Sequence, residues 1–270
     1  MKARYVTAAR LGQLERSLSG RDRAIITTLD ELRVATTLHL RRLHFAELTP
    51  ASAARQAPAA LRRLADLRIV CQLERQVGGV RAGSAAAVWA LDVAGQRLAS
   101  ACGPAGGSAT RRPWTPSLPF VAHRLTVSEL AVALIERARG GDLELLSFEA
   151  EPLSWRRFTA PLGGSSYVKP DATVRLAIGD YERGSFVEVD QSTESLSTIR
   201  RKCAAFRHYW ETGREQSRHG YFPLVVFAVP DAHRRDLISA VVERQPDEAQ
   251  ALFRVVVAGE LAAALIGGAA

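Results

Sequence analysis

Cysteine, long hydrophobic runs and nucleotide-binding motifs are scarce or missing in this sequence. The three cysteines, Cys71, Cys102 and Cys203, form no CxxC pair, so they predict neither a zinc site nor a disulfide framework and favour a reducing cytoplasm. The first thirty residues contain no long apolar run, and we therefore expect no signal peptide or membrane segment there. No GxxxxGK[ST] segment occurs, which argues against an ATP-driven motor.

Positive charge is concentrated in the first part of the chain. The 270 residues carry a net charge of +8, with 36 Lys and Arg against 28 Asp and Glu. Residues 1–112 hold 18 basic and 8 acidic side chains, whereas residues 113–270 hold 18 and 20. This asymmetry indicates a polyanion-binding segment joined to a mildly acidic one. The alternative is that the excess arginine only keeps the protein soluble.

Residues 1–100 show the order of three helices followed by a β-hairpin. Apolar spacing and capping residues predict helices from Ser19, over 37–45 and over 58–67, and strands over 69–73 and 87–91. We expect Pro58 in the first turn of the third helix rather than in its interior. A glycine-rich basic loop connects the two strands.

This order resembles the winged-helix module of many bacterial DNA-binding proteins. The resemblance implies that the third helix enters the major groove and that the wing contacts the DNA backbone. The expected DNA contacts are Arg55, Arg62, Arg63 and Arg81. Two other interpretations remain open: a small helical domain with solvated arginines, and a module that docks proteins.

Residues 101–122 are rich in Gly, Ser and Pro and show no periodic pattern, which predicts a linker. The sequence thus divides into a DNA-binding domain over 1–100, the linker, and a second domain over 123–270. The second domain is expected to contain helices over 123–139, 195–210 and 231–244, and strands over 143–149, 168–178, 185–189, 224–229 and 253–257. The strand over 168–178 is expected to be broken at Pro170-Asp171. We therefore predict an α/β (α+β) fold with an αβββαβ core.

Carboxylates mark two neighbouring strands of this second domain. Asp171 follows Lys169-Pro170, and Glu188 and Asp190 end the next strand. Acidic oxygens on adjacent strands are typical ligands of Mg²⁺. The alternative is that these carboxylates cap strands or pair with arginines on the following helix.

The pattern resembles the core of PD-(D/E)xK nucleases, in which a lysine is expected at the position of Asp190. The resemblance implies that Asp171 and Glu188 hold Mg²⁺ or Mn²⁺, that Glu129 is a further metal ligand, and that Lys202 supplies the cation from the following helix. Asp190 would bind a second ion or stand in place of the lysine. An active nuclease and a decayed nuclease fold that still binds DNA both remain open.

The whole chain resembles the replication-relaxation family of plasmids and integrative conjugative elements. The residues that carry this resemblance are Ser19-Gly20-Arg21-Asp22, Ala35-Thr36-Thr37, Lys169-Pro170-Asp171, and the stretch from Glu188 through Glu194 and Lys202 to Tyr209. It implies a relaxase-like nickase that acts with a divalent metal on double-stranded DNA at an origin of transfer or replication. The alternative is a non-catalytic replication initiator or regulator. Expected partners also include a second copy of the chain and conjugation-complex proteins.

Overall fold

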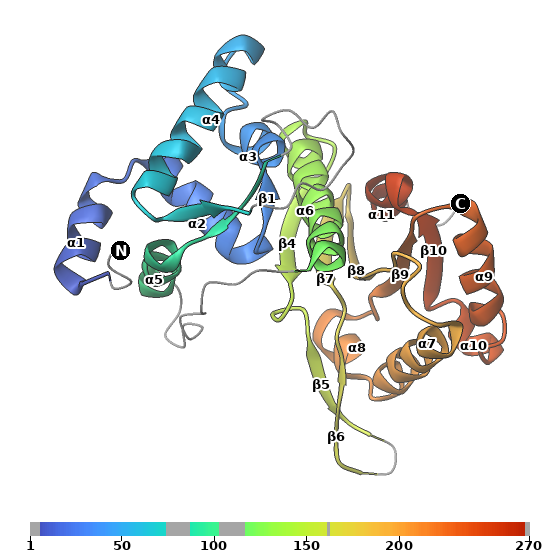
Figure 1. Cartoon of the computed structure of the whole chain (residues 1–270). Coiled ribbons are helices and arrows are strands. Elements are labelled where there is room, and N and C mark those ends of the chain that lie inside the picture. The colour runs from blue at the N-terminus through green and yellow to red at the C-terminus, as the bar shows by residue number, and fades with distance from the viewer. Residues whose placement is uncertain (1–5, 74–86, 103–116, 161–162, 268–270) are drawn as a thin grey trace. The chain divides into compact units, whose positions relative to one another are not determined.

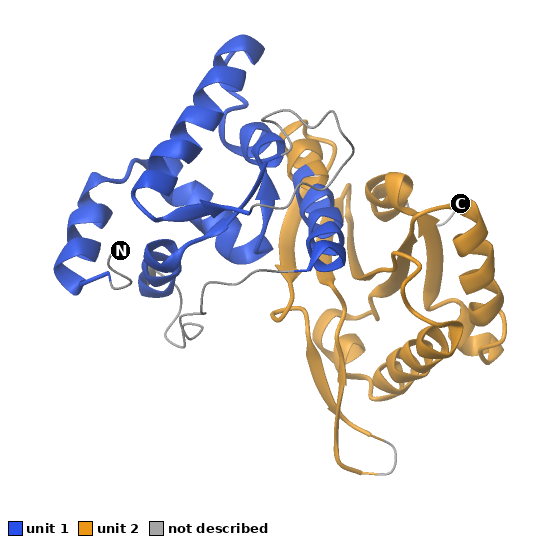
Figure 2. Cartoon of the chain, in the orientation of Figure 1, with its two compact units in different colours: residues 1–132 blue, residues 133–270 orange. Residues whose placement is uncertain are grey.

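The computed structural model describes residues 6–73, 87–102, 117–160 and 163–267. The chain forms two compact units, Met1–Val132 and Ala133–Ala270, which we call unit 1 and unit 2 (Figure 2). The division falls inside one long helix rather than in the expected linker. Each unit is described separately below.

Unit 1 is mostly helical and carries a small sheet (Figure 1). Its elements are α1 (Ala8–Ser17), α2 (Gly20–Leu32), β1 (Ala35–Thr36), α3 (Thr37–His44), α4 (Pro50–Asp66), β2 (Val70–Gln72), β3 (Val88–Leu91), α5 (Val93–Cys102) and the first part of α6 (Leu118–Arg139). The strands lie in the order β1-β3-β2, and both pairs are antiparallel. The predicted helices and hairpin strands are present, whereas α1, β1 and α5 are not predicted by the sequence.

Side-chain caps define where the helices of unit 1 begin. The Ser19 hydroxyl accepts a hydrogen bond from the Asp22 amide at 3.1 Å, and the Asp22 carboxylate accepts one from the Ser19 amide at 3.0 Å. This reciprocal pair satisfies two amides that a helix start would otherwise leave unbonded. Thr36 and Thr49 cap α3 and α4 through their hydroxyl oxygens.

The third predicted helix, α4, begins eight residues earlier than expected, at Pro50 instead of Pro58. Pro58 therefore lies in the helix interior, and its predicted position in the first turn is wrong. An interior proline removes one backbone hydrogen bond. A buried stripe extends over both sides of Pro58 and holds the helix against the core; it consists of Ala53, Ala57, Leu61 and Leu64.

Helix α6 is the one helix in the described part of the chain that is long and apolar enough to cross a membrane. Some 44% of its apolar window is buried inside the protein, and Val121 and Leu134 are fully buried. Val121 packs with Val34 and Val88 of unit 1. This burial is compatible with a core helix and with the expected absence of a membrane segment.

Unit 2 is built on a five-stranded mixed sheet. Its strands are β4 (Glu144–Ala150), β7 (Ala172–Ile178), β8 (Tyr181–Val189), β9 (Leu224–Val229) and β10 (Phe253–Val257), in the order β10-β9-β8-β7-β4. The pairs β4–β7 and β7–β8 are antiparallel, whereas β8–β9 and β9–β10 are parallel. Helices α7 (Leu196–Glu211) and α9 (Ala232–Val242) make the crossovers that parallel neighbours require.

Apolar residues of α7 and α9 cover one face of this sheet. Ile199, Cys203 and Phe206 recur at helical spacing on α7 and share a core cluster with Phe186 of β8 and Phe227 of β9. The Ser195 hydroxyl accepts a hydrogen bond from the Thr198 amide at 3.2 Å and so fixes the start of α7. Strands β9 and β10 have the predicted limits. The sequence does not predict α8 (Arg214–His219), α10 (Asp247–Gln250), the 3₁₀ turn η2 (Ala258–Glu260) and α11 (Leu261–Gly267).

A β-hairpin is inserted between β4 and β7 and projects from the sheet of unit 2 (Figure 1). Its strands, β5 (Arg156–Thr159) and β6 (Ser165–Val168), form a separate two-stranded antiparallel sheet. The expected strand over 168–178, broken at Pro170-Asp171, is divided at this point, because β6 ends at Val168 and β7 begins at Ala172. Pro170 lies between them and has no amide hydrogen to donate to a ladder. The predicted mixed α/β class is confirmed.

Candidate functional site

The strand ends of unit 2 bring two acidic side chains together. Asp171 directly precedes β7, and Glu188 is the penultimate residue of the antiparallel strand β8. Both therefore lie at the end of the sheet where β7 begins and β8 ends. The Asp171 carboxylate accepts a hydrogen bond from the Val189 amide at 2.7 Å. Both carboxylates are buried, with residue exposures of 7% and 3%. The structure thus places Asp171 and Glu188 at adjacent strand ends, where the Asp171 charge acts on Glu188.

Lys202 of α7 reaches this acidic pair. Its ammonium donates to Glu188 Oε2 at 2.7 Å and lies 2.9 Å from Glu194 Oε1. The Lys202 side chain is 32% exposed, so it extends from the buried glutamate to solvent. Glu194 precedes the cap of α7; in the sequence it is only one of the residues that carry the family resemblance, and it is not predicted as a site residue.

Burial dominates the electrostatics of Glu188. Desolvation and the neighbouring Asp171 carboxylate raise the pKa of Glu188 to about 8, although Lys202 acts in the opposite direction. Burial acts to lower the pKa of Lys202, but the Glu188 and Glu194 carboxylates outweigh it and raise that pKa above its ordinary value. Lys202 therefore stays positively charged, whereas the negative charge of the buried Glu188 is only partly compensated by it.

Asp190 is held differently from the other two acids. Its Oδ2 atom accepts a hydrogen bond from Arg234 Nε of α9 at 2.5 Å, and its Oδ1 atom accepts one from the Ser192 amide at 3.0 Å. Asp190 and Arg234 are both buried. Arg234 also donates to the main-chain oxygen of Glu194 at 2.6 Å. Through these contacts Arg234 anchors the loop after β8 to the start of α9.

Glu129 is engaged within unit 1. Its carboxylate receives two 2.8 Å hydrogen bonds from Arg42 and lies 3.0 Å from Nε2 of the buried His39. The hydrogen bond with His39 and the Arg42 guanidinium lower the pKa of Glu129 to about 2. Because these basic groups occupy the carboxylate, we leave Glu129 out of the candidate metal site.

The donor set of Asp171 and Glu188 fits a magnesium or manganese ion. Mg²⁺ is commonly bound by one or two carboxylates together with waters and substrate phosphates. Two adjacent buried carboxylates, one with a raised pKa, are also a place where a divalent charge is favourable. In the described residues no group of three or more His, Cys, Asp or Glu side chains forms a complete metal cage. The remaining ligands would therefore come from water, main chain or substrate.

The predicted DNA-contacting arginines of α4 differ in their surroundings. Arg55 and Arg62 are exposed. Arg63 donates to Asp22 Oδ1 at 2.5 Å, and Asp22 is buried within the capping box of α2. Arg63 thus braces the fold of unit 1 with a side chain that is still half exposed. Arg81 lies outside the described residues.

Together these features define a class of protein: a helical unit with a three-stranded sheet, joined to a mixed-sheet unit with an acidic pair beside a lysine. The chain belongs to the replication-relaxation family, whose model matches residues 26–225. No curated protein and no solved structure matches the chain significantly. Membership confirms the resemblance seen in the sequence, and it implies a replication-related, relaxase-like role and an interaction with DNA.

Proposed function

We propose that this chain is a metal-dependent DNA nickase that acts at an origin of transfer or replication of a plasmid or integrative conjugative element, in the cytoplasm. The observation that carries the proposal is the buried Asp171–Glu188 pair beside Lys202 at one edge of the sheet. The strand order, with two antiparallel pairs followed by two parallel ones, supports a PD-(D/E)xK-like core.

Asp171 and Glu188 would hold Mg²⁺ or Mn²⁺, and Asp171 is kept in place by the Val189 amide. Such an ion polarises a phosphate oxygen and lowers the pKa of bound water when it is present. Lys202 places a positive charge next to the pair, where it stabilises negative charge that develops on a phosphate. Glu194 limits the movement of the Lys202 side chain by binding the same ammonium.

Unit 1 would supply the binding of double-stranded DNA through α4. Arg55 and Arg62 are exposed on this helix, on the side away from its buried stripe. Exposed arginines on the third helix of such a module are placed for contacts with a DNA groove and its phosphates. Arg63 would add a phosphate contact from its exposed half.

A nicking assay tests the proposal. Supercoiled DNA that carries the cognate origin is incubated with the full chain and Mg²⁺ or Mn²⁺, and the open-circle product is measured. Asp171→Ala and Glu188→Gln should abolish the product. Asp180→Asn is the matched control, because Asp180 is an exposed acid in the turn that joins the same two strands. Product that persists in Asp171→Ala would contradict the proposal.

A second function, a DNA-binding initiator or regulator without catalysis, is favoured by one observation. The position where the nuclease pattern has a lysine is Asp190, and this residue is neutralised by Arg234 instead of facing a substrate. A salt-sensitive gel shift that is lost in Arg55→Ala/Arg62→Ala, together with no cleavage under either metal, would support this alternative.

A further inference from the structure

The outer face of the β5–β6 hairpin alternates aromatic and basic side chains. The hairpin register places Arg157 opposite Tyr167 and Thr159 opposite Ser165. Continued by one residue, the register places Trp155 opposite Lys169. Residues that face each other across an antiparallel pair lie on the same side of the sheet.

The rings and the lysine of this face are in direct contact. The Lys169 ammonium lies 4.5 Å from the centroid of the Trp155 ring and 5.7 Å from that of Tyr167. The Trp155 indole donates a hydrogen bond to Glu151 at 3.1 Å, which fixes the orientation of the ring. Trp155 and Tyr167 nevertheless remain 39% and 46% exposed. Large aromatic rings held in a fixed orientation on the surface are available for stacking.

The opposite face of the hairpin anchors it to unit 2. Phe158 and Val168 point into the core of unit 2, where Phe158 packs against Tyr209 with a centroid distance of 5.4 Å. The Tyr209 hydroxyl donates to the buried carboxylate of Glu215. The hairpin is thus anchored through one face, and the other face is free to meet a ligand.

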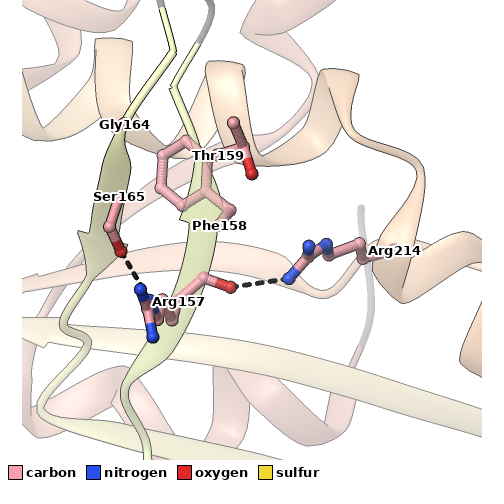
Figure 3. Close-up of a pocket in the computed structure, with 6 residues that line it drawn as sticks. All are labelled: Arg157, Phe158, Thr159, Gly164, Ser165 and Arg214. Carbon is pink, nitrogen blue, oxygen red and sulfur yellow. Dashed lines mark hydrogen bonds between the residues drawn. The ribbon is translucent and has the colours of Figure 1, made fainter.

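A pocket of about 570 Å³ lies between the hairpin strands and Arg214, the first residue of α8 (Figure 3). It is lined by Arg157, Phe158, Thr159, Gly164, Ser165 and Arg214. The Arg157 guanidinium donates to the Ser165 hydroxyl at 2.5 Å, and Arg214 donates to the main-chain oxygen of Arg157 at 2.8 Å. In these hydrogen bonds both arginines donate to neutral oxygens. Both guanidinium groups therefore keep their charge for an anion.

We infer that this hairpin face is a binding platform for single-stranded DNA, with bases stacked on Trp155 and Tyr167 and phosphates bound by Lys169, Arg157 and Arg214. Aromatic rings interleaved with basic side chains are the common feature of single-strand binding surfaces, because every base presents a π-face. The platform leads through Lys169 and Pro170 directly to Asp171. The inference rests on the proposed function, in which one strand of the DNA is cut.

Fluorescence anisotropy of the full chain with labelled oligo(dT) tests the platform. The measurement is made in EDTA at low salt, so it needs no metal and no cleavage. The variants are Trp155→Ala/Tyr167→Ala and, with the rings kept, Trp155→Phe/Tyr167→Phe. Tyr181→Ala is the matched control, because Tyr181 is a 73% exposed tyrosine on β8. Circular dichroism confirms that each variant is folded.

The alanine pair should weaken oligo(dT) binding by roughly tenfold for each stacked base. The phenylalanine pair should lose much less affinity than the alanine pair, Tyr181→Ala should bind as the wild type does, and affinity for a duplex should not change. The inference is overturned if the wild type fails to bind oligo(dT), if the alanine pair binds normally, or if duplex affinity falls equally. Failure of the nicking assay alone would leave these binding results intact and would reject only the metal site.

Discussion

Replacement of Glu188 by glutamine should change the pH dependence of folding stability. Glu188 has a pKa of about 8 in the fold, against an ordinary value of 4.5, mainly because burial disfavours its charged form. A raised pKa means that the folded state binds this proton more tightly than the unfolded state. The stability that this proton contributes to the fold is fully present below pH 4.5 and is lost as the pH rises through 8. At about 1.4 kcal/mol for each pKa unit, the loss is on the order of 5 kcal/mol.

Urea unfolding of the wild type and of Glu188→Gln between pH 5 and pH 8.5 measures this effect. The stability of the wild type should fall relative to that of the variant as the pH rises, so the variant becomes the more stable protein at pH 8.5. Asp180→Asn, which changes an exposed acid, should follow the wild type. A pH-independent difference between wild type and Glu188→Gln would refute the assignment of a buried, destabilised carboxylate.

Three further predictions follow from the same contacts. Asp190→Ala should destabilise the fold by about 3–5 kcal/mol, because it leaves Arg234 buried without its partner; urea unfolding measures this loss. Arg63→Ala should cost about 1 kcal/mol of stability through Asp22, whereas Arg62→Ala should weaken duplex binding in a gel shift and leave the unfolding midpoint unchanged. Mn²⁺ affinity, measured by calorimetry, should increase about tenfold with each unit that the pH rises toward 8 and level off above it, because the buried Glu188 must lose its proton first.

Strong local signals are what made much of the fold predictable. The run Leu224–Val229 is apolar on both faces, as expected of a buried strand between parallel neighbours, and its limits are confirmed. Helix α7 combines a capping serine with an apolar stripe at helical spacing, and its limits are confirmed within one residue. The meeting of Asp171 with Glu188 follows from the same reasoning, because neighbouring antiparallel strands place the start of one beside the end of the other.

Other parts of the fold depend on contacts that no local pattern encodes. The β5–β6 hairpin buries mainly Phe158 and Val168, so its strands lack a run of apolar residues that would identify them. Arg234 lies 44 residues from Asp190 in the sequence, and only the crossover through β9 brings them together. Helix α8 has six residues, too few to show a helical period. Long-range pairing, rather than propensity, determines these features.

A crystal of the full chain grown with Mn²⁺ gives the most direct test of the proposed metal site. Anomalous scattering would locate the ion without ambiguity among light atoms. The account predicts one strong peak between the carboxylates of Asp171 and Glu188, and no peak there in crystals of Glu188→Gln. An ion bound elsewhere in the wild type, or a peak that survives the Glu188→Gln substitution, would contradict it.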